Sequence, residues 1–353
     1  MANKVTGSTD TTGALSIAPT LAKSVLLVAQ KKGDVAKETA PNTVFSIVGT
    51  SDAADKFGSE SIMIKAVKAL IQNGSDNIYG IIVDSTVSGD NDISVNYATA
   101  LEASLGEASV KMIVLDSFDE KIITELKTHL SMAEIDDMFR YAVVPPAEND
   151  RDKIIEFAKS INDSRVFVPG AVFTDGTNTI DRTIVAAGIS GVIMTETNDP
   201  ALPMNGVVIR GIGSVDRTVL ESERNMFAQN GVVAIYNDGD PTINRLVTSY
   251  TKDKIWQEGT TRFIADYVLE NVENTLRSNY KRTKNVTRIL DSIKTTVKGL
   301  LENFDNLEII ENFDASTLTV VKDPTDSYGA IVEYEIDVVT PLYTITINQH
   351  MKI

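Results

Sequence analysis

The sequence contains no cysteine and only two histidines among its 353 residues. The missing cysteine excludes disulfides, thiolate metal sites and cysteine nucleophiles. The histidines, His129 and His350, form no Glu-x-x-His or His-x-x-x-His pair, so a zinc site or a catalytic triad would need distant acids. We interpret both as solvated or interface side chains.

Motifs that bind phosphate, calcium or an acyl group are also missing. The glycine-rich stretch 211–216 lacks the third glycine of a dinucleotide fingerprint and any Gly-Lys-Ser/Thr ending, so it predicts a tight turn. The acidic loops 175–181 and 237–240 complete no calcium pattern, and turn chemistry accounts for them. No Gly-x-Ser-x-Gly elbow occurs. The sequence therefore predicts no enzyme, no metal site and no cofactor.

Long apolar runs and positive charge are scarce as well. No stretch approaches the roughly 20 apolar residues that span a bilayer, and residues 1–19 lack the apolar core of a secretory signal. The formal net charge of −16 argues against nucleic acid or a membrane as partner, because both would repel the chain. One segment is basic, with a single acid, Asp291, among these residues: Arg277, Lys281, Arg282, Lys284, Arg288, Lys294 and Lys298.

Between about residues 44 and 250, short apolar runs alternate with segments of helical period. The expected strands are 44–48, 78–83, 110–115, 139–144, 165–168, 206–210 and 232–236, and the expected helices are 59–72, 97–105, 119–135, 150–161, 219–230 and one that begins at Asn178 or Thr179. Continuous apolar strands separated by amphipathic helices indicate a mainly parallel sheet flanked by helices. The predicted fold class is α/β.

After Trp256 the pattern changes to two long helices, 260–279 and one running through 286–301, and then to strands. In 331–339 apolar residues alternate with acids, which is typical of a half-buried strand. This pattern predicts a smaller α+β domain. The expected organisation is an N-terminal arm at 1–22, an outer α/β domain at 23–250, a C-terminal α+β assembly domain at 251–339 and a C-terminal arm at 340–353.

Four of the basic residues, which we call the basic band, are spaced by 4, 3 and 4: Arg277, Lys281, Lys284 and Arg288. They would form one stripe if the helix were unbroken. A charge run is usually a solvated face. The near absence of acidic partners four residues away, in so acidic a chain, favours a recognition surface instead.

Short motifs follow one another in a characteristic order. Early in the chain these are Thr50-Ser51, Phe57-Gly58, the helix at 59–72, Asn73-Gly74 and the strand at 78–83; late in the chain they are Gln229 to Val233, a helix that starts near Arg262, Tyr280 to Asn285 and the alternating strand at 331–339. In this order the chain resembles contractile tail sheath proteins, and its compact length is similar to R-type bacteriocin sheaths of the diffocin-like kind. One departure is that Arg282 or Thr283 stands where many members have a glycine.

The resemblance implies a structural subunit. Such a subunit polymerises as stacked hexameric rings around an inner tube and contracts to drive the tube through a target cell envelope. Its arms add strands to neighbouring subunits, here through Leu15, Ile17, Tyr343, Ile345 and Ile347, and its basic band faces the tube. The implied partners are neighbouring sheath subunits, the inner tube protein, and baseplate and terminator or collar proteins. The protein would be made in the bacterial cytoplasm and leave it in a phage tail or a bacteriocin.

An alternative of another class stays open. An α/β small-molecule-binding protein or enzyme would place its site at the carboxyl ends of the strands, near Ser51, Asp84 and Asp116. Acids and serines are also common there as helix caps and turn residues.

Overall fold

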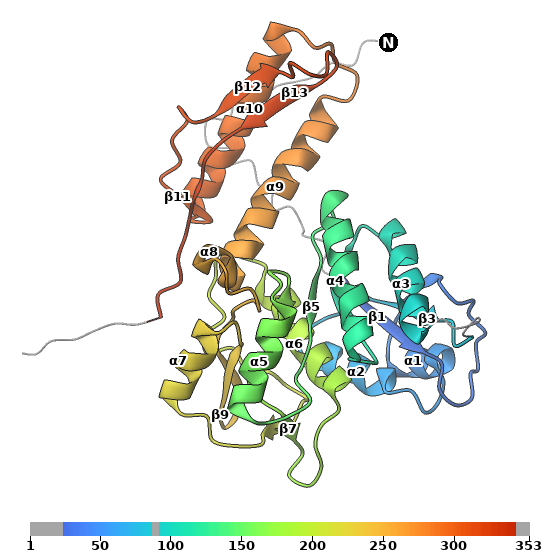
Figure 1. Cartoon of the computed structure of the whole chain (residues 1–353). Coiled ribbons are helices and arrows are strands. Elements are labelled where there is room, and N and C mark those ends of the chain that lie inside the picture. Colours follow the sequence, from blue (N-terminus) through green and yellow to red (C-terminus); the bar gives the residue numbers. More distant parts are fainter. Residues whose placement is uncertain (1–23, 87–91, 344–353) are drawn as a thin grey trace, which may run out of the picture. The chain divides into compact units, whose positions relative to one another are not determined.

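The computed structural model describes residues 24–86 and 92–343 (Figure 1). These residues divide into two compact units, which separate between Tyr267 and Val268. The larger unit comprises 24–267 and 340–343, and the smaller comprises 268–339. The boundary expected at 250/251 stays a prediction. The arm positions Leu15, Ile17, Ile345 and Ile347 and the second histidine, His350, lie outside the described residues.

The larger unit is built on a six-stranded sheet of order β2-β3-β1-β4-β5-β6. Its strands are β1 (Ser24–Gln30), β2 (Val44–Ile47), β3 (Ile78–Val83), β4 (Val110–Leu115), β5 (Tyr141–Val143) and β6 (Val166–Phe167). All neighbours run parallel except β2, which pairs antiparallel with β3 at one edge. The prediction of a mainly parallel sheet in an α/β fold is confirmed.

The central strand β1 has no counterpart among the expected strands. Its residues Val25 to Ala29 are fully buried, as is all of β4 beside it. A strand covered on both faces carries apolar residues without alternation, and β1 has this pattern. It begins immediately after the expected N-terminal arm, upstream of the region where the alternation of strands and helices was expected.

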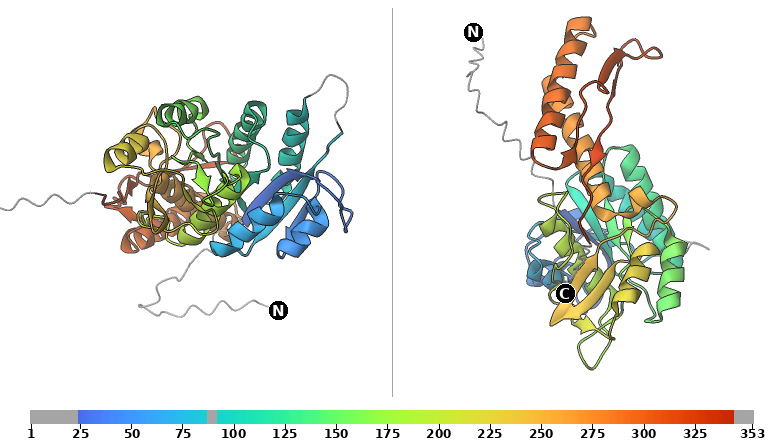
Figure 2. Two further views of the ribbon diagram at one scale, coloured as in Figure 1. Left: turned by 90° about the horizontal axis from the view of Figure 1, so that it is seen from below. Right: turned by 90° about the vertical axis from the view of Figure 1, so that its left-hand side faces the viewer.

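Helices cover both faces of the sheet (Figure 2). The helices of this unit are α1 (Thr50–Phe57), α2 (Met63–Gln72), α3 (Ile93–Ala103), α4 (Glu120–Ile135), α5 (Arg151–Ile161), α6 (Arg182–Glu196), α7 (Glu221–Gln229) and α8 (Lys254–Gln257), with a 3-10 turn at Ser104–Gly106. α6 is the central one, since every residue from Thr183 to Met194 is buried. It packs on α2 at Gly191, where a Cβ atom would lie 3.2 Å from the Leu70 carbonyl oxygen. A larger residue there would push the two helices apart.

Phe57-Gly58 lies at the end of α1. Gly58 has a φ of +102°, which side-chain-bearing residues rarely adopt. A Cβ atom here would lie 2.0 Å from the carbonyl oxygen of Lys32. Lys32 in turn donates its backbone N–H to the carbonyl of Phe57. Glycine is therefore required for the segment after β1 to reach this turn.

Small two-stranded sheets complete the larger unit: β7 (Phe173–Thr174) with β8 (Ser214–Val215), and β9 (Ala234–Asp238) with β10 (Asp240–Arg245). The acidic loops are turns, as expected. Asp175 accepts the N–H groups of Thr177 and Asn178, and Gly239 turns the chain between β9 and β10.

Three local predictions in this unit are wrong. The segment 206–210 is not a strand, because only Val208 makes an isolated bridge, to Thr242. The helix expected from Asn178 or Thr179 begins at Arg182, because the Asp181 side chain accepts the N–H of Thr183 and caps it. His129 is not solvated: it is 4% exposed inside α4.

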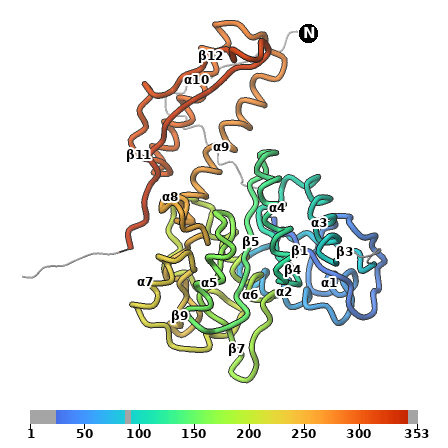
Figure 3. The backbone as a smooth tube through the Cα atoms, in the orientation of Figure 1, coloured from blue at the N-terminus to red at the C-terminus, as the bar shows by residue number. Residues whose placement is uncertain are grey.

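The smaller unit contains the second part of α9 (Gly259–Asn279), α10 (Thr287–Asn306), and the strands β11 (Ile310–Glu311), β12 (Thr319–Lys322), β13 (Ala330–Glu333) and β14 (Asp337–Val338) (Figure 3). The two long helices are confirmed. The strand expected at 331–339 is divided into β13 and β14, which pair with β12 and β11 respectively. The alternation in burial persists through it, with Tyr334 and Ile336 partly buried and Glu335 exposed.

In the part of the chain that the structure describes, no helix is both long and apolar enough to cross a lipid bilayer.

Candidate assembly surfaces

The strands of the smaller unit have open edges. β12 pairs with β13 alone and β11 with β14 alone, among the described strands. Each two-stranded ribbon therefore presents unpaired backbone N–H and C=O groups along its outer edges. Such edges can accept a strand from another chain. α10 packs against both ribbons: it contacts β11 and β12, and its residues Val297, Leu301 and Phe304 are buried.

The basic band lies around the turn between two helices, so the condition for one continuous stripe, an unbroken helix, is not met. α9 ends at Asn279 and α10 begins at Thr287. Arg277 is in the last turn of α9, Lys281 and Lys284 are in the connecting loop, and Arg288 is in the first turn of α10. All four side chains belong to exposed residues. Among the described residues, no carboxylate forms an ion pair with Lys281, Lys284 or Arg288.

Hydrogen bonds fix both ends of the loop that carries Lys281 and Lys284. The Tyr280 hydroxyl is bonded to Ser292 and Thr296 of α10, at 3.0 and 2.8 Å. The Asn285 amide donates to the carbonyl oxygens of Ser327 and Gly329, at 3.3 and 2.8 Å, in the turn that joins β12 to β13. Between them Arg282 has a φ of +155°. Arg282 is one of the two positions, with Thr283, that stand where many tail sheath proteins have a glycine, and its backbone has a conformation that favours glycine.

The start of the expected C-terminal arm contacts the larger unit. The Tyr343 hydroxyl donates to Glu258 at 2.7 Å, and the Arg245 guanidinium lies 4.6 Å from the centre of the Tyr343 ring. Arg245 is also bonded to Glu258, at 2.9 Å. Burial and the Glu258 charge raise the pKa of Tyr343, so the hydroxyl stays a donor. Tyr343, expected on an inter-subunit strand, thus has a partner within its own chain.

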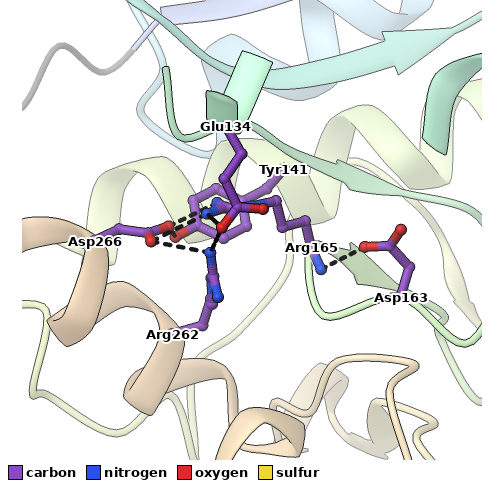
Figure 4. A network of polar contacts seen from close by, with 6 residues as sticks. All are labelled: Glu134, Tyr141, Asp163, Arg165, Arg262 and Asp266. Carbon is purple, nitrogen blue, oxygen red and sulfur yellow. Dashed lines mark hydrogen bonds and ion pairs between the residues drawn. The ribbon is translucent and has the colours of Figure 1, made fainter. Parts of the chain in front are cut away.

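A buried ionic network joins α9 to the sheet of the larger unit (Figure 4). Arg165, 2% exposed, donates to both carboxyl oxygens of Asp266 at 2.7 and 3.1 Å. It donates to Glu134 as well, at 2.9 and 3.1 Å. Tyr141 donates to Asp266, and Arg262 bonds Glu134. Side chains from α9, α4 and β5 thereby meet around the guanidinium of Arg165, which directly precedes β6.

The network shifts the pKa values of its ionisable groups. The bond from Arg165 lowers the pKa of Glu134 to about 2. Burial by itself would lower the pKa of Arg165, but Asp266 and Glu134 raise it overall. Burial raises the pKa of Tyr141. Sequence analysis missed the network, although one signal was available: Asp266 lies between Phe263 and Tyr267 on the apolar side of α9.

At the carboxyl ends of the strands, the side chains of Asp116 and Asp84 accept hydrogen bonds from groups of the same chain. Asp116 follows β4 and accepts the Tyr97 hydroxyl on one oxygen and the Gln30 N–H on the other, at 3.0 Å for the latter. Asp84 accepts the N–H of Thr86 at 2.8 Å, as a turn residue does. Ser51 is exposed in the first turn of α1. Both acids are therefore engaged within their own chain. Across the described residues, no three His, Cys, Asp or Glu side chains gather as a metal site would require.

A cavity of about 550 Å³ lies beside the start of α7. Its lining contains two acidic and two basic residues: Asp216, Glu221, Arg217 and Arg224. Arg217 pairs with Glu223 at 2.7 Å, and Arg224 stacks on Tyr236 at 4.5 Å. These arginines serve the packing of α7.

Comparison with known proteins now bears on the whole chain. Residues 251–352 match the family model of the phage tail sheath C-terminal domain. The contracted helical sheath protein of the anti-feeding prophage is similar in structure, with a TM-score of 0.71 and 15% identity over 93% of this chain and 92% of that one. Residues 251–352 thus belong to the family of the phage tail sheath C-terminal domain, and the fold of the whole chain is that of the solved sheath protein.

Two further solved structures are similar to this chain. A chain of the anti-feeding prophage baseplate has a TM-score of 0.72 and 15% identity, over 100% of this chain and 99% of that one. The sheath tail protein of Listeria innocua has a TM-score of 0.69 and 12% identity, over 90% and 92%. No curated protein sequence matches the chain. The family match includes all of α9, α10 and β11 to β14, which carry the basic band and the open strand edges.

Proposed function

We propose that this chain is the repeating subunit of a contractile sheath. It polymerises as stacked hexameric rings around an inner tube, and contraction of the sheath drives the tube through a target cell envelope. The match of residues 251–352 to the phage tail sheath C-terminal domain carries this proposal. The subunit acts structurally and not as an enzyme. Negative-stain electron microscopy of the purified protein tests it: striated tubes or rings are expected, and uniform small particles under all assembly conditions would contradict it.

The free energy for contraction comes from the assembly itself. The extended sheath is metastable, and contraction forms new contacts between subunit bodies, as in other devices that release stored strain. No nucleotide is consumed. Besides other sheath subunits and the tube, the partners are the baseplate and a terminator or collar protein. The protein is made in the bacterial cytoplasm and released in a particle, either a phage tail or an R-type bacteriocin.

The two arms link neighbouring subunits by strand addition. Residues 1–22 and 344–353 each supply a strand to the smaller unit of a neighbour, whose open edges at β11 to β14 support this proposal. Backbone hydrogen bonds give such an interface its affinity, and alternate side chains give it register. Leu15 and Ile17 of one arm and Ile345 and Ile347 of the other supply these side chains.

Deletion of residues 1–15 or of 344–353 is therefore expected to abolish polymerisation and leave folded monomers. Each deletion removes the added strand while the described core of both units remains. The second deletion retains Tyr343, so its contact with Glu258 is preserved. Analytical ultracentrifugation gives the assembly state, and circular dichroism gives the fold. Ordered polymers from either truncated protein would refute the role of that arm.

The basic band faces the acidic outer surface of the inner tube. Its support is the charge pattern: three exposed cations, Lys281, Lys284 and Arg288, without ion-pair partners among the described residues of a chain with a net charge of −16. Replacing all three by glutamate is expected to abolish co-sedimentation with tubes, since like charges repel. Sheath-only polymers should still form, and microscopy checks this. Unchanged tube binding would eliminate the tube-facing role.

A further inference from the structure

The six-stranded sheet of the larger unit has two edges, and its own chain covers the one at β6. Beyond β6, the N–H of Ser249 donates to the carbonyl oxygen of Val166 at 2.8 Å. The N–H of Val233 donates to the carbonyl oxygen of Val168, also at 2.8 Å, and Val233 forms a parallel bridge with Pro169. The backbone groups at this edge are therefore already paired within the chain.

β2 forms the other edge, and its only neighbour among the described strands is β3. The run from Val44 to Val48 is apolar except for Ser46, and it contains no charge, proline or glycine. Val48, directly after the strand, is 88% exposed. An uncharged edge rich in β-branched and aromatic residues is typical of strands that pair with other chains and aggregate.

The pairing of the neighbouring strands shows which backbone groups of β2 face outward. β1 donates an N–H to Asn77, so every second residue after Asn77 in β3 also faces β1. The intervening residues of β3 face β2, where they lie opposite Phe45 and Ile47. Backbone groups alternate in direction along a strand, so those of Ser46 and Val48 point away from the sheet.

Two side chains of α1 bind these outward groups. The Lys56 ammonium donates to the Ser46 carbonyl oxygen at 2.6 Å. The Asp52 carboxylate accepts the N–H of Val48 at 3.3 Å, and it pairs with Lys56 at 3.1 Å. A residue of a parallel strand opposite Ile47 would make the same two bonds, one as donor and one as acceptor. The ion pair therefore occupies the place of a neighbouring strand.

The surroundings of this ion pair hold it in position. The side chains of Lys56 and Asp52 are 17% and 18% exposed. The ammonium lies 4.7 Å from the centre of the Phe45 ring, and Lys37 lies 3.4 Å from the second Asp52 oxygen. Burial by itself would raise the pKa of Asp52, but the bonds from Lys56 and Val48 lower it overall, so the carboxylate stays charged. A strand that added to β2 would have to break these charge-assisted bonds.

We infer that Lys56 and Asp52 close the one edge of the main sheet that the backbone leaves open, and thereby confine strand addition between chains to the smaller unit. The ribbons of that unit keep their outer edges unpaired among the described strands. The closure of β2 follows from the contacts of the larger unit alone. The confinement of strand addition rests on the proposed function.

Replacing Lys56 by methionine opens the edge and keeps a side chain of similar length over the Phe45 ring. The chain has no cysteine, so V48C supplies a single thiol for a pyrene label, and excimer fluorescence then reports β2 strands that pair in the full-length protein. In K56M the protein concentration at half-maximal excimer should be about tenfold lower than in the labelled parent, because a charge-assisted bond no longer has to be broken. Electron microscopy of K56M should show disordered aggregates beside the ordered polymers.

Three control variants carry the same label. K56R keeps a cation that can donate to the Ser46 carbonyl, so it should behave like the parent. K65M makes the same substitution at an exposed lysine of α2 and should also leave the excimer signal unchanged. E134Q lowers the stability of the larger unit without a contact to β2, so it should produce no excimer if the edge itself is responsible.

The outcomes separate this inference from the proposed function. If K56M behaves like the parent, or if E134Q gives the same excimer signal as K56M, the closure of β2 is wrong and the proposed function is unaffected. If K56M forms excimers while its polymers are as ordered as those of the parent, the confinement of strand addition is wrong. If K56M forms excimers but neither protein assembles into tubes or rings, the closure is supported and the proposed function fails.

Discussion

Replacing Asp266 by alanine should lower the free energy of unfolding of the larger unit by about 3 to 5 kcal/mol. The change leaves Arg165 buried without its closest carboxylate, at a site where its side chain is 2% exposed. It also removes the acceptor of the buried Tyr141 hydroxyl. Trp256 is the single tryptophan of the chain and lies 5.0 Å from the Arg262 guanidinium, so its fluorescence reports unfolding near the network.

Matched variants separate the buried charge from the packing. E134Q changes a carboxylate whose side chain is 43% exposed, so solvent screening limits its cost to about 1 kcal/mol. The double variant R165M/D266L removes both charges and should recover much of the stability lost in D266A, because no unpaired ion is left behind. If D266A lowered the free energy of unfolding by less than E134Q does, the network would not anchor α9.

Acidification below about pH 6.5 is expected to destabilise the protein, because His129 is buried against a guanidinium. Its Nε2 atom lies 3.0 Å from Nη1 of Arg140, which donates to it. Burial, reinforced by the Arg140 charge, lowers the pKa of His129 from 6.5 to about 3. Protonated histidine would place two donors and two positive charges together.

The sign of the pH dependence follows from this shift. The unfolded chain takes up a proton near pH 6.5, whereas the folded chain does so only near pH 3. Stability is therefore complete above pH 6.5 and falls as the pH is lowered toward 3, by about 2 kcal/mol at pH 5 and about 4 kcal/mol at pH 3. Denaturant unfolding at a series of pH values measures it.

The variant H129Q isolates this contribution. Glutamine offers Arg140 an acceptor oxygen but does not titrate, so the loss of stability between pH 7 and pH 5 should nearly disappear. H350Q, which replaces the other histidine of the chain, should leave the parent profile unchanged. If H129Q retained the full pH dependence, another group would have to be responsible.

Much of the fold could be predicted because continuous apolar runs are informative. Segments such as 110–115 are apolar throughout, and a strand is the element that buries such a run between two layers of helices. Helical period likewise predicted α9 and α10. The central strand β1 carries the same signal in residues 24–30, and only its proximity to an expected arm concealed it.

Other features depended on contacts that local sequence does not contain. The basic band has helical spacing, but the chain turns after Asn279, where Tyr280 bonds to Ser292 and Thr296 of the following helix. His129 has an ordinary helical neighbourhood and becomes buried because Arg140 folds against it. The strand at 331–339 keeps its alternation in burial, yet two different partners divide it.

The sequence by itself determined the α/β class, the two long helices, the absence of cysteine chemistry and the concentration of positive charge near residue 280. These properties depend on composition and on short-range periodicity, which each segment carries independently. The tertiary structure alone decided the ionic network around Arg165, the burial of His129 against Arg140 and the bonds of Asn285 to the turn between β12 and β13. Each of these requires residues distant in sequence to meet, and the free energy of such a meeting depends on the whole packed unit.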